Sequence, residues 1–199
     1  MNRVQLPVDS HILQELGIGR VLCSRINDIM AKPTSKRHRQ YLELLNRQIN
    51  GYHDLDPADV YRERELVPTA LAAYETRHGV SLDRGLFYQD PHYDFIGCCP
   101  DAVESDLIGI SVHIRQTEET YERAIDDNTN AYDMRVAQAS MAVTGLNHWL
   151  YLNYFEDRAI RKRRLSESLF ERNPLADEML IKMAWFWTKA VQYEASSGE

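Results

Sequence analysis

Residues 95–115, FIGCCPDAVESDLIGISVHIR, constrain the fold of this chain more than any other stretch. From Leu107 to Ile114, apolar residues at every second position alternate with small or polar ones, which is typical of a strand with one buried face. Phe95 to Cys99 is a second short apolar run. The stretch therefore predicts two strands joined by a polar turn, with Asp101 beside the polar face of the second strand.

A carboxylate in this position has a chemical meaning. An acid beside a hairpin is a common way to hold a divalent cation next to a phosphodiester. Asp101 is thus the first candidate for a catalytic residue and for a metal ligand. It is also a turn residue after a proline, a position that aspartate favours because its side chain bonds to nearby backbone. Both interpretations stay open.

The rest of the chain predicts helices before the hairpin and helices around one further strand after it. Ser24 is the expected N-cap of a helix over 25–31, and Asp9 or Ser10 that of the first helix. We expect helices over 9–17, 25–31, 35–50, from Asp56–Pro57 onward, from Pro68 to His78, over 129–144 and from Pro174 to 195. We expect strands over 86–88, 95–99, 107–114 and 148–155.

Length and composition favour a single domain over residues 1–199 in a reducing compartment. A chain of 199 residues with 44% hydrophobic residues can bury a sizeable core. No run of eighteen apolar residues predicts a membrane span, and the N-terminus lacks the apolar core of a signal peptide. The three cysteines, two of them adjacent, form no disulfide framework. We expect Trp149, Tyr151, Trp185 and Trp187 to belong to the core.

The motifs resemble those of a known family over roughly residues 16–157. Cys98–Asp101 matches a small-small-Pro-Asp turn, and a Glu-x-Lys motif falls on Ser111–His113. Three further segments match in order, namely Ser24–Pro33, Val67–Ala70 followed by Tyr74–Glu75, and Gln138–Gly145. This layout resembles the lambda exonuclease (YqaJ-type viral recombinase) branch of the PD-(D/E)xK nucleases. The resemblance implies an α/β (α+β) fold with a central mixed sheet flanked by helices.

The resemblance also implies a degenerate active site. Asp101 and Gln138 are retained, but Val67 and Ser111 stand where the family has metal-binding acids, and His113 stands at the lysine. Valine cannot coordinate a metal, serine is a poor Mg²⁺ ligand, and neutral histidine prefers softer metals. We therefore expect Asp101, His113 and Gln138 to be the remnant of a site that holds no cofactor. If cleavage survives, the cofactor is Mg²⁺ or Mn²⁺, with a replacement acid from Glu63, Glu65, Glu104 or Asp106.

Charge gives a second set of candidates. The net charge of −7 is unfavourable for a protein that wraps duplex DNA, but basic residues gather in two places. The candidates for contacting nucleic acid are Arg20, Ser24, Lys32, Lys36, Arg37 and Arg39. The second basic set is Arg158, Arg161, Lys162, Arg163 and Arg164, and acids concentrate over 101–127. Solvated helix faces and loops are the alternative interpretation of both basic sets.

Three functions are compatible with these observations. The first is a nuclease fold without activity that binds nucleic acid or a protein. The second is an active metal-dependent 5′–3′ DNA exonuclease. The third is an inhibitor from a phage or mobile element, in which the acidic segment mimics a phosphate backbone and blocks a host defence complex. The expected partners are DNA, a single-strand annealing protein or such a complex, with a homotrimer implied by the resemblance and the host cytoplasm as location.

Overall fold

The computed structural model describes residues 2–5, 12–52, 66–126, 131–157 and 162–193. Several sequence predictions fall outside these ranges. They are the Asp9 and Ser10 caps, the helix from Asp56–Pro57, the acids Glu63 and Glu65, and the basic residues Arg158 and Arg161.

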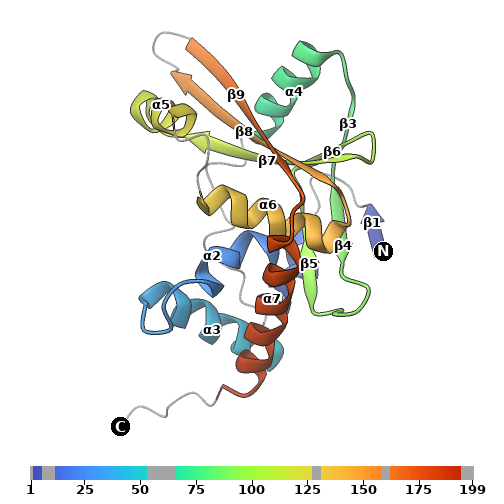
Figure 1. Ribbon diagram of the computed structural model, residues 1–199, viewed down its shortest axis with the longest axis vertical. Coiled ribbons are helices and arrows are strands. Elements are labelled where there is room, and N and C mark those ends of the chain that lie inside the picture. Colours follow the sequence, from blue (N-terminus) through green and yellow to red (C-terminus); the bar gives the residue numbers. More distant parts are fainter. Residues whose placement is uncertain (1, 6–11, 53–65, 127–130, 158–161, 194–199) are drawn as a thin grey trace.

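The predicted α+β class, with helices around mixed sheets, is confirmed, and the strands form two sheets (Figure 1). The first sheet has the order β1-β4-β5-β2, and the second the order β3-β6-β7-β8-β9. The strands of the first are β1 (Asn2–Gln5), β2 (Val21–Leu22), β4 (Leu86–Gln89) and β5 (Ile96–Cys98). Those of the second are β3 (Leu82–Asp83), β6 (Ala102–Glu104), β7 (Ile108–Arg115), β8 (His148–Asp157) and β9 (Lys162–Glu171).

The partner of β7 differs from the expectation. The sequence predicted pairing with residues 95–99, but β7 forms its hairpin with β6, where Ala102 lies opposite Ile110. The segment over 95–99 forms β5, which pairs with β4 and β2 in the other sheet. β6 was hidden inside the predicted polar turn, although Val103 is fully buried. The turn itself is short, with Ser105 and Asp106 at φ of 51° and 57°.

The second sheet is built around the parallel pair β7 and β8. Parallel neighbours need a crossover connection, and the helices α5 (Glu118–Asp126) and α6 (Ala131–Thr144) lie on it. β9 then pairs with β8 in antiparallel fashion from His148↔Glu171 to Asp157↔Lys162. The predicted helix over 129–144 and strand over 148–155 are confirmed where the structure describes them, whereas α5 and β9 were not predicted.

The other helices are α1 (Ile12–Gly17), α2 (Ile26–Ile29), α3 (Lys36–Ile49), α4 (Val67–His78) and α7 (Leu175–Val191), with a 3₁₀ turn at Cys23–Arg25. The prediction that Ser24 caps the second helix is wrong, because Ser24 lies exposed inside the 3₁₀ turn and Arg25 holds the cap position without a side-chain bond. Ser35 does cap α3, since its Oγ accepts from the backbone N–H of His38. Gly79 ends α4 in the left-handed conformation, as expected.

Alternate residues of β8 divide the core into two apolar clusters. Trp149 and Tyr151 belong to the cluster that α6 and α7 cover, and Leu150 and Leu152 to the cluster that α4 covers. The indole of Trp149 lies on the backbone of Gly109, its neighbour on β7, where a Cβ would be 2.2 Å from the ring. The second sheet is therefore covered on both faces, as a strand pair of this hydrophobicity requires.

α7 departs from the predicted core in two places. Met183 and Phe186 are buried, and Trp187 stacks on Phe95 with ring centroids 4.1 Å apart. Trp185 and Val191, both expected inside, are 50% and 46% exposed. Within the described residues, no helix has the length and apolar character to span a membrane.

Candidate functional site

Asp101 follows β5 and Pro100, and its carboxylate is bound to the backbone of β7. Its N–H donates to the carbonyl of Ile110 at 2.9 Å, and its Oδ2 accepts from the N–H of Val112 at 2.7 Å. The side chain thus extends the β6–β7 ladder by one bond before the first residue of β6. This is the role of a structural turn residue, and it uses one of the two carboxylate oxygens.

Ser111 and His113 lie on the face of β7 that is turned toward α6. Ser111 Oγ accepts from the indole Nε1 of Trp149 at 3.0 Å. The imidazole of His113 meets the ring of Tyr151 edge-on at 4.9 Å between centroids. Ser111 and His113, on which the Glu-x-Lys motif falls, therefore both contact aromatic side chains of β8.

Arg115, the next residue on this face, dominates the charge around His113. Its Nη2 lies 3.3 Å from His113 Nδ1, and both Nε and Nη2 donate to Oδ1 of Asn153, at 2.9 and 2.6 Å. Asp133, from the first turn of α6, places Oδ1 3.5 Å from His113 Nδ1 and Oδ2 3.9 Å from Arg115 Nη2. Three elements, β7, β8 and α6, thus converge on one polar cluster of His113, Arg115, Asp133 and Asn153.

The imidazole in this cluster is neutral at pH 7. Removal from water and the adjacent guanidinium of Arg115 lower the pKa of His113 to about 4. The side chain keeps 31% of its surface exposed, and the carboxylate of Asp133 acts in the opposite direction. Burial and the charge of Arg115 together outweigh the effect of Asp133 on the pKa. The imidazole is therefore unprotonated at Nδ1, which can accept a hydrogen bond from Arg115.

Gln138 is engaged at both ends of its amide. Its Nε2 donates to the carbonyl of Glu171 at 2.7 Å, and its Oε1 accepts from the N–H of Asn173 at 3.0 Å. The residue is 1% exposed. It ties α6 to the link between β9 and α7, so its amide is occupied by backbone groups.

The remaining residues of the predicted site are also committed elsewhere. Val67 is partly buried against the cluster under α4. Arg20 donates to the carbonyls of Leu16 and Asp94 at 2.7 and 3.1 Å. Of the described replacement acids, Glu104 accepts from the hydroxyl of Tyr74 at 2.7 Å, and Asp106 pairs with Arg3.

These residues do not fit a magnesium ion. Mg²⁺ prefers an octahedron of oxygens, with carboxylates to offset its charge. Here one carboxylate supports the β7 backbone, Ser111 Oγ accepts from an indole, and a guanidinium lies beside the histidine. Over the described parts of the chain, no three His, Cys, Asp or Glu residues gather closely enough to hold a metal.

The two basic sets have different environments. On β9, Lys162 and Arg164 pair with Glu118 of α5, Arg164 also pairs with Glu122, and Arg163 pairs with Glu156. The described part of the second set is therefore neutralised by α5 and β8. In the first set, Lys32, Lys36, Arg37 and Arg39 are exposed. Arg37 also donates to the carbonyl of Asn27 and lies 3.6 Å from Asp28.

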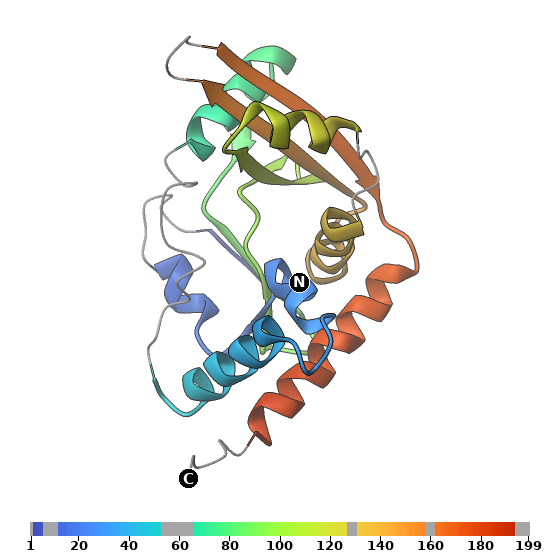
Figure 2. The same ribbon diagram turned by 90° about the vertical axis from the view of Figure 1, so that its left-hand side faces the viewer.

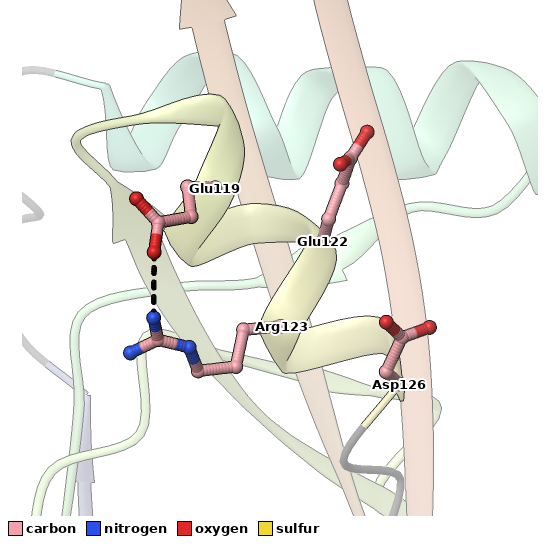
Figure 3. Close-up of a pocket in the computed structure, with 4 residues that line it drawn as sticks. All are labelled: Glu119, Glu122, Arg123 and Asp126. Carbon is pink, nitrogen blue, oxygen red and sulfur yellow. Dashed lines mark hydrogen bonds and ion pairs between the residues drawn. The ribbon is translucent and has the colours of Figure 1, made fainter.

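A shallow hollow lies on the outer surface of α5 (Figure 3). It is lined by Glu119, Glu122, Arg123 and Asp126, and Arg123 pairs with Glu119 across one helical turn at 2.7 Å. None of the residues predicted for the catalytic site lines it. Its four side chains come from one solvated helix, so it adds no chemistry to the cluster around His113.

Sequence reasoning missed Arg115, Asp133 and Asn153. Arg115 had a signal, because it continues the period-two series of Ser111 and His113 on the same face of β7. Asp133 had a weaker one, as an acid suits the first turn of a helix. Asn153 had none, since its place opposite His113 depends on the parallel register of β7 and β8.

Comparison with known proteins supports the fold. No protein-family model matches the chain, and no curated protein does. Among solved structures, an alkaline exonuclease (LHK-Exo) from Laribacter hongkongensis matches with a TM-score of 0.76 at 20% identity, over 91% of this chain and 92% of that one. Its complex with dAMP matches equally well at 22% identity over the same shares. A phage-related exonuclease from Haemophilus somnus 129PT matches with a TM-score of 0.57 at 15% identity, over 87% and 92%.

Proposed function

We propose that this chain is an exonuclease-fold protein that has lost metal-dependent phosphodiester cleavage and acts by binding a nucleic acid or a protein partner. Its likeness to alkaline and phage-related exonucleases gives the fold. The observation that carries the loss of chemistry is the missing carboxylates: Val67 and Ser111 stand at two of the family's acid positions, while the guanidinium of Arg115 lies 3.3 Å from the histidine at the lysine position.

Electrostatics explains why this observation matters. A fixed positive charge a few ångströms away repels a divalent cation by several kcal/mol at an effective dielectric constant of 20. Only extra carboxylates could offset that repulsion. Val67 and Ser111 occupy two positions where the family has metal-binding acids, so neither supplies one. Asp133, the acid nearest to this point, already lies between Arg115 and His113.

The test is a cleavage assay on linear duplex DNA with Mg²⁺ or Mn²⁺. We expect no release of nucleotides above that of a matched Asp101→Asn variant. Asparagine keeps a side-chain oxygen for the N–H of Val112, so the variant preserves the hairpin while removing the charge that a metal needs. Isothermal titration with Mn²⁺ should show no site in either protein.

Degradation by the parent protein that disappears in Asp101→Asn contradicts the proposal and establishes an active exonuclease. Degradation that persists unchanged in Asp101→Asn comes from a contaminant and leaves no activity for this site. The two proteins should unfold at the same temperature within a few degrees, which excludes misfolding as the cause of any difference.

The acidic residues over 101–127 give little support to the alternative function as an inhibitor. Its argument needs a continuous row of free acids over 101–127. Instead, the described acids in this segment serve internal contacts at several points: Asp101 with Val112, Glu104 with Tyr74, Asp106 with Arg3, and Glu118 and Glu122 with β9. A basic partner would have to compete with these contacts.

A further inference from the structure

The outer face of α7 presents a large aromatic side chain to solvent. Trp185 is 50% exposed and Ile181, one helical turn before it, is 64% exposed. The opposite face of the same helix is buried through Met179, Met183 and Phe186. Trp185 thus contributes little to the core, so packing does not explain a tryptophan at this position.

Two lysines flank Trp185 on α7, and the nearest acid along the helix is the exposed Glu178, one turn before Lys182. From Met179 to Tyr193, the charged residues are Lys182 and Lys189. Lys189 Nζ lies 5.3 Å from the centroid of the Trp185 ring, and Lys182 is three residues before it on the helix. An indole flanked by two ammonium groups is suited to a ligand that has both a flat π-system and negative charge.

α3 lies beside α7 (Figures 1 and 2). Phe186 of α7 stacks on Tyr41 at 5.2 Å, and Asn46 donates to the carbonyl of Ala190 at 2.8 Å. Lys182 and Lys189 are one turn before and after Phe186, so they lie on the α3 side of Trp185.

Arg39 of α3 lies near the C-terminal end of α7. The charge of Arg39 acts on the hydroxyl of Tyr193, where it opposes the effect of Glu43 on the pKa of that group. Lys36 and Arg39 are exposed. Glu43 is the acid within this helix, and it accepts from the Tyr193 hydroxyl at 3.3 Å. The surface formed by Lys36, Arg39, Lys182, Trp185 and Lys189 is called the α3–α7 surface below.

We propose that the α3–α7 surface binds single-stranded nucleic acid, with Trp185 stacking on a base and the four basic residues contacting phosphates. This names a ligand for the binding role proposed above. It uses residues apart from Asp101 and His113, so it stands or falls independently of cleavage.

A single strand fits this surface better than a duplex or an apolar helix. Bases in a duplex are stacked on one another, whereas an unpaired base can stack on an exposed indole. The net charge of −7 opposes the wrapping of a duplex and leaves only a local positive surface. A partner helix would need a wider apolar stripe than Ile181 and Trp185 supply.

The experiment measures binding of fluorescein-labelled oligo(dT), oligo(U) and a duplex of equal length, in EDTA so that cleavage plays no part. Trp185→Ala should weaken binding of the single strands by about 5- to 150-fold, the range for loss of one stacked base. Lys182→Ala/Lys189→Ala should weaken it and lower the salt dependence by about 1.4 in the log–log slope. The oligo(dT) and oligo(U) arms show whether the sugar is read.

The matched control is Arg123→Ala/Arg163→Ala, which removes two exposed basic residues from α5 and β9. It should bind like the parent protein. Equal binding by Trp185→Ala and the parent overturns the proposal, as does the absence of single-strand binding. Sedimentation that changes in Trp185→Ala while binding does not would assign this face to self-association, which also overturns it. Circular dichroism should show every variant folded.

Discussion

Gln138→Ala should destabilise the protein without a separate effect on ligand binding. The sequence left two roles open for this residue, helix packing or a phosphate contact. Its amide joins α6 to the carbonyl of Glu171 and to the N–H of Asn173, and the residue is 1% exposed. Truncation leaves both backbone groups without their partner in a place that water does not easily reach.

The expected loss of stability follows from these contacts. Two hydrogen bonds contribute about 1 kcal/mol each, and the unpaired buried groups raise the cost toward about 3 kcal/mol. Loss of the buried Cγ adds about 0.8 kcal/mol. We therefore expect the free energy of unfolding to fall by about 2–4 kcal/mol. With a slope of about 2 kcal/mol per molar urea, the midpoint moves down by about 1–2 M.

Urea unfolding followed by circular dichroism measures this change. Gln40→Ala is the matched control, because Gln40 is exposed on α3, and its midpoint should stay within about 0.3 M of the parent. An unchanged midpoint in Gln138→Ala refutes the structural role. A stable Gln138→Ala protein that has lost oligonucleotide affinity would instead indicate that Gln138 contributes to binding.

Two further predictions concern the second sheet. The pKa of His113 is about 4 in the folded protein and 6.5 ordinarily, so between these values the unfolded chain binds a proton that the folded one does not. The free energy of unfolding should therefore fall as the pH drops from 6.5 toward 4. The slope should be smaller in His113→Asn, which keeps an acceptor for Arg115 beside Asp133; equal slopes in urea titrations across this range contradict the neutral imidazole. Gly109→Ala would place a Cβ 2.2 Å from the Trp149 ring, and overpacking of this kind costs about 1–3 kcal/mol. Its melting temperature should fall well below that of Gly17→Ala, where the nearest atom is the flexible end of Leu22 at 3.1 Å, and equal melting temperatures would show that the indole can move freely.

Sequence alone predicted the elements with strong periodicity. The alternation over 107–114 gave β7, the apolar run at 148 gave β8, and the helical spacing of apolar residues over 35–50 gave α3. In each of these, local pattern and tertiary burial agree. The class of fold was expected from the resemblance of the motifs around Asp101 and their order to those of the lambda exonuclease family.

The elements that sequence missed depend on tertiary contacts. β9 begins with the charged residues Lys162 to Arg164, a pattern typical of a solvated segment. In the folded chain, Glu118 and Glu122 of α5 pair with Lys162 and Arg164. β6 looked like a turn because its short apolar pair lies between the polar residues Asp101 and Glu104, and only its pairing with β7 shows the strand. Trp185 was assigned to the core on residue type alone, which does not tell one face of α7 from the other.

For the candidate site, the sequence indicated which backbone positions lie close together but not what their side chains contact. Asp101 directly precedes β6 and binds the backbone of β7, the strand that carries Ser111 and His113. What they contact could not be read from the chain, because Arg115, Asp133 and Asn153 come together only through the parallel register of β7 and β8 and the placement of α6. A motif fixes which backbone positions meet, whereas the neighbouring side chains decide the chemistry.

β9 is an edge strand of its sheet, and this position gives its basic first residues a role other than binding DNA. One side of this ten-residue strand faces β8, and the other side has no strand of the described chain hydrogen-bonded to it. An open margin of that length invites another molecule to add a strand and begin a fibril. Exposed charged side chains such as that of Arg163 disfavour such an addition, so the basic start of β9 is suited to protect this margin from aggregation.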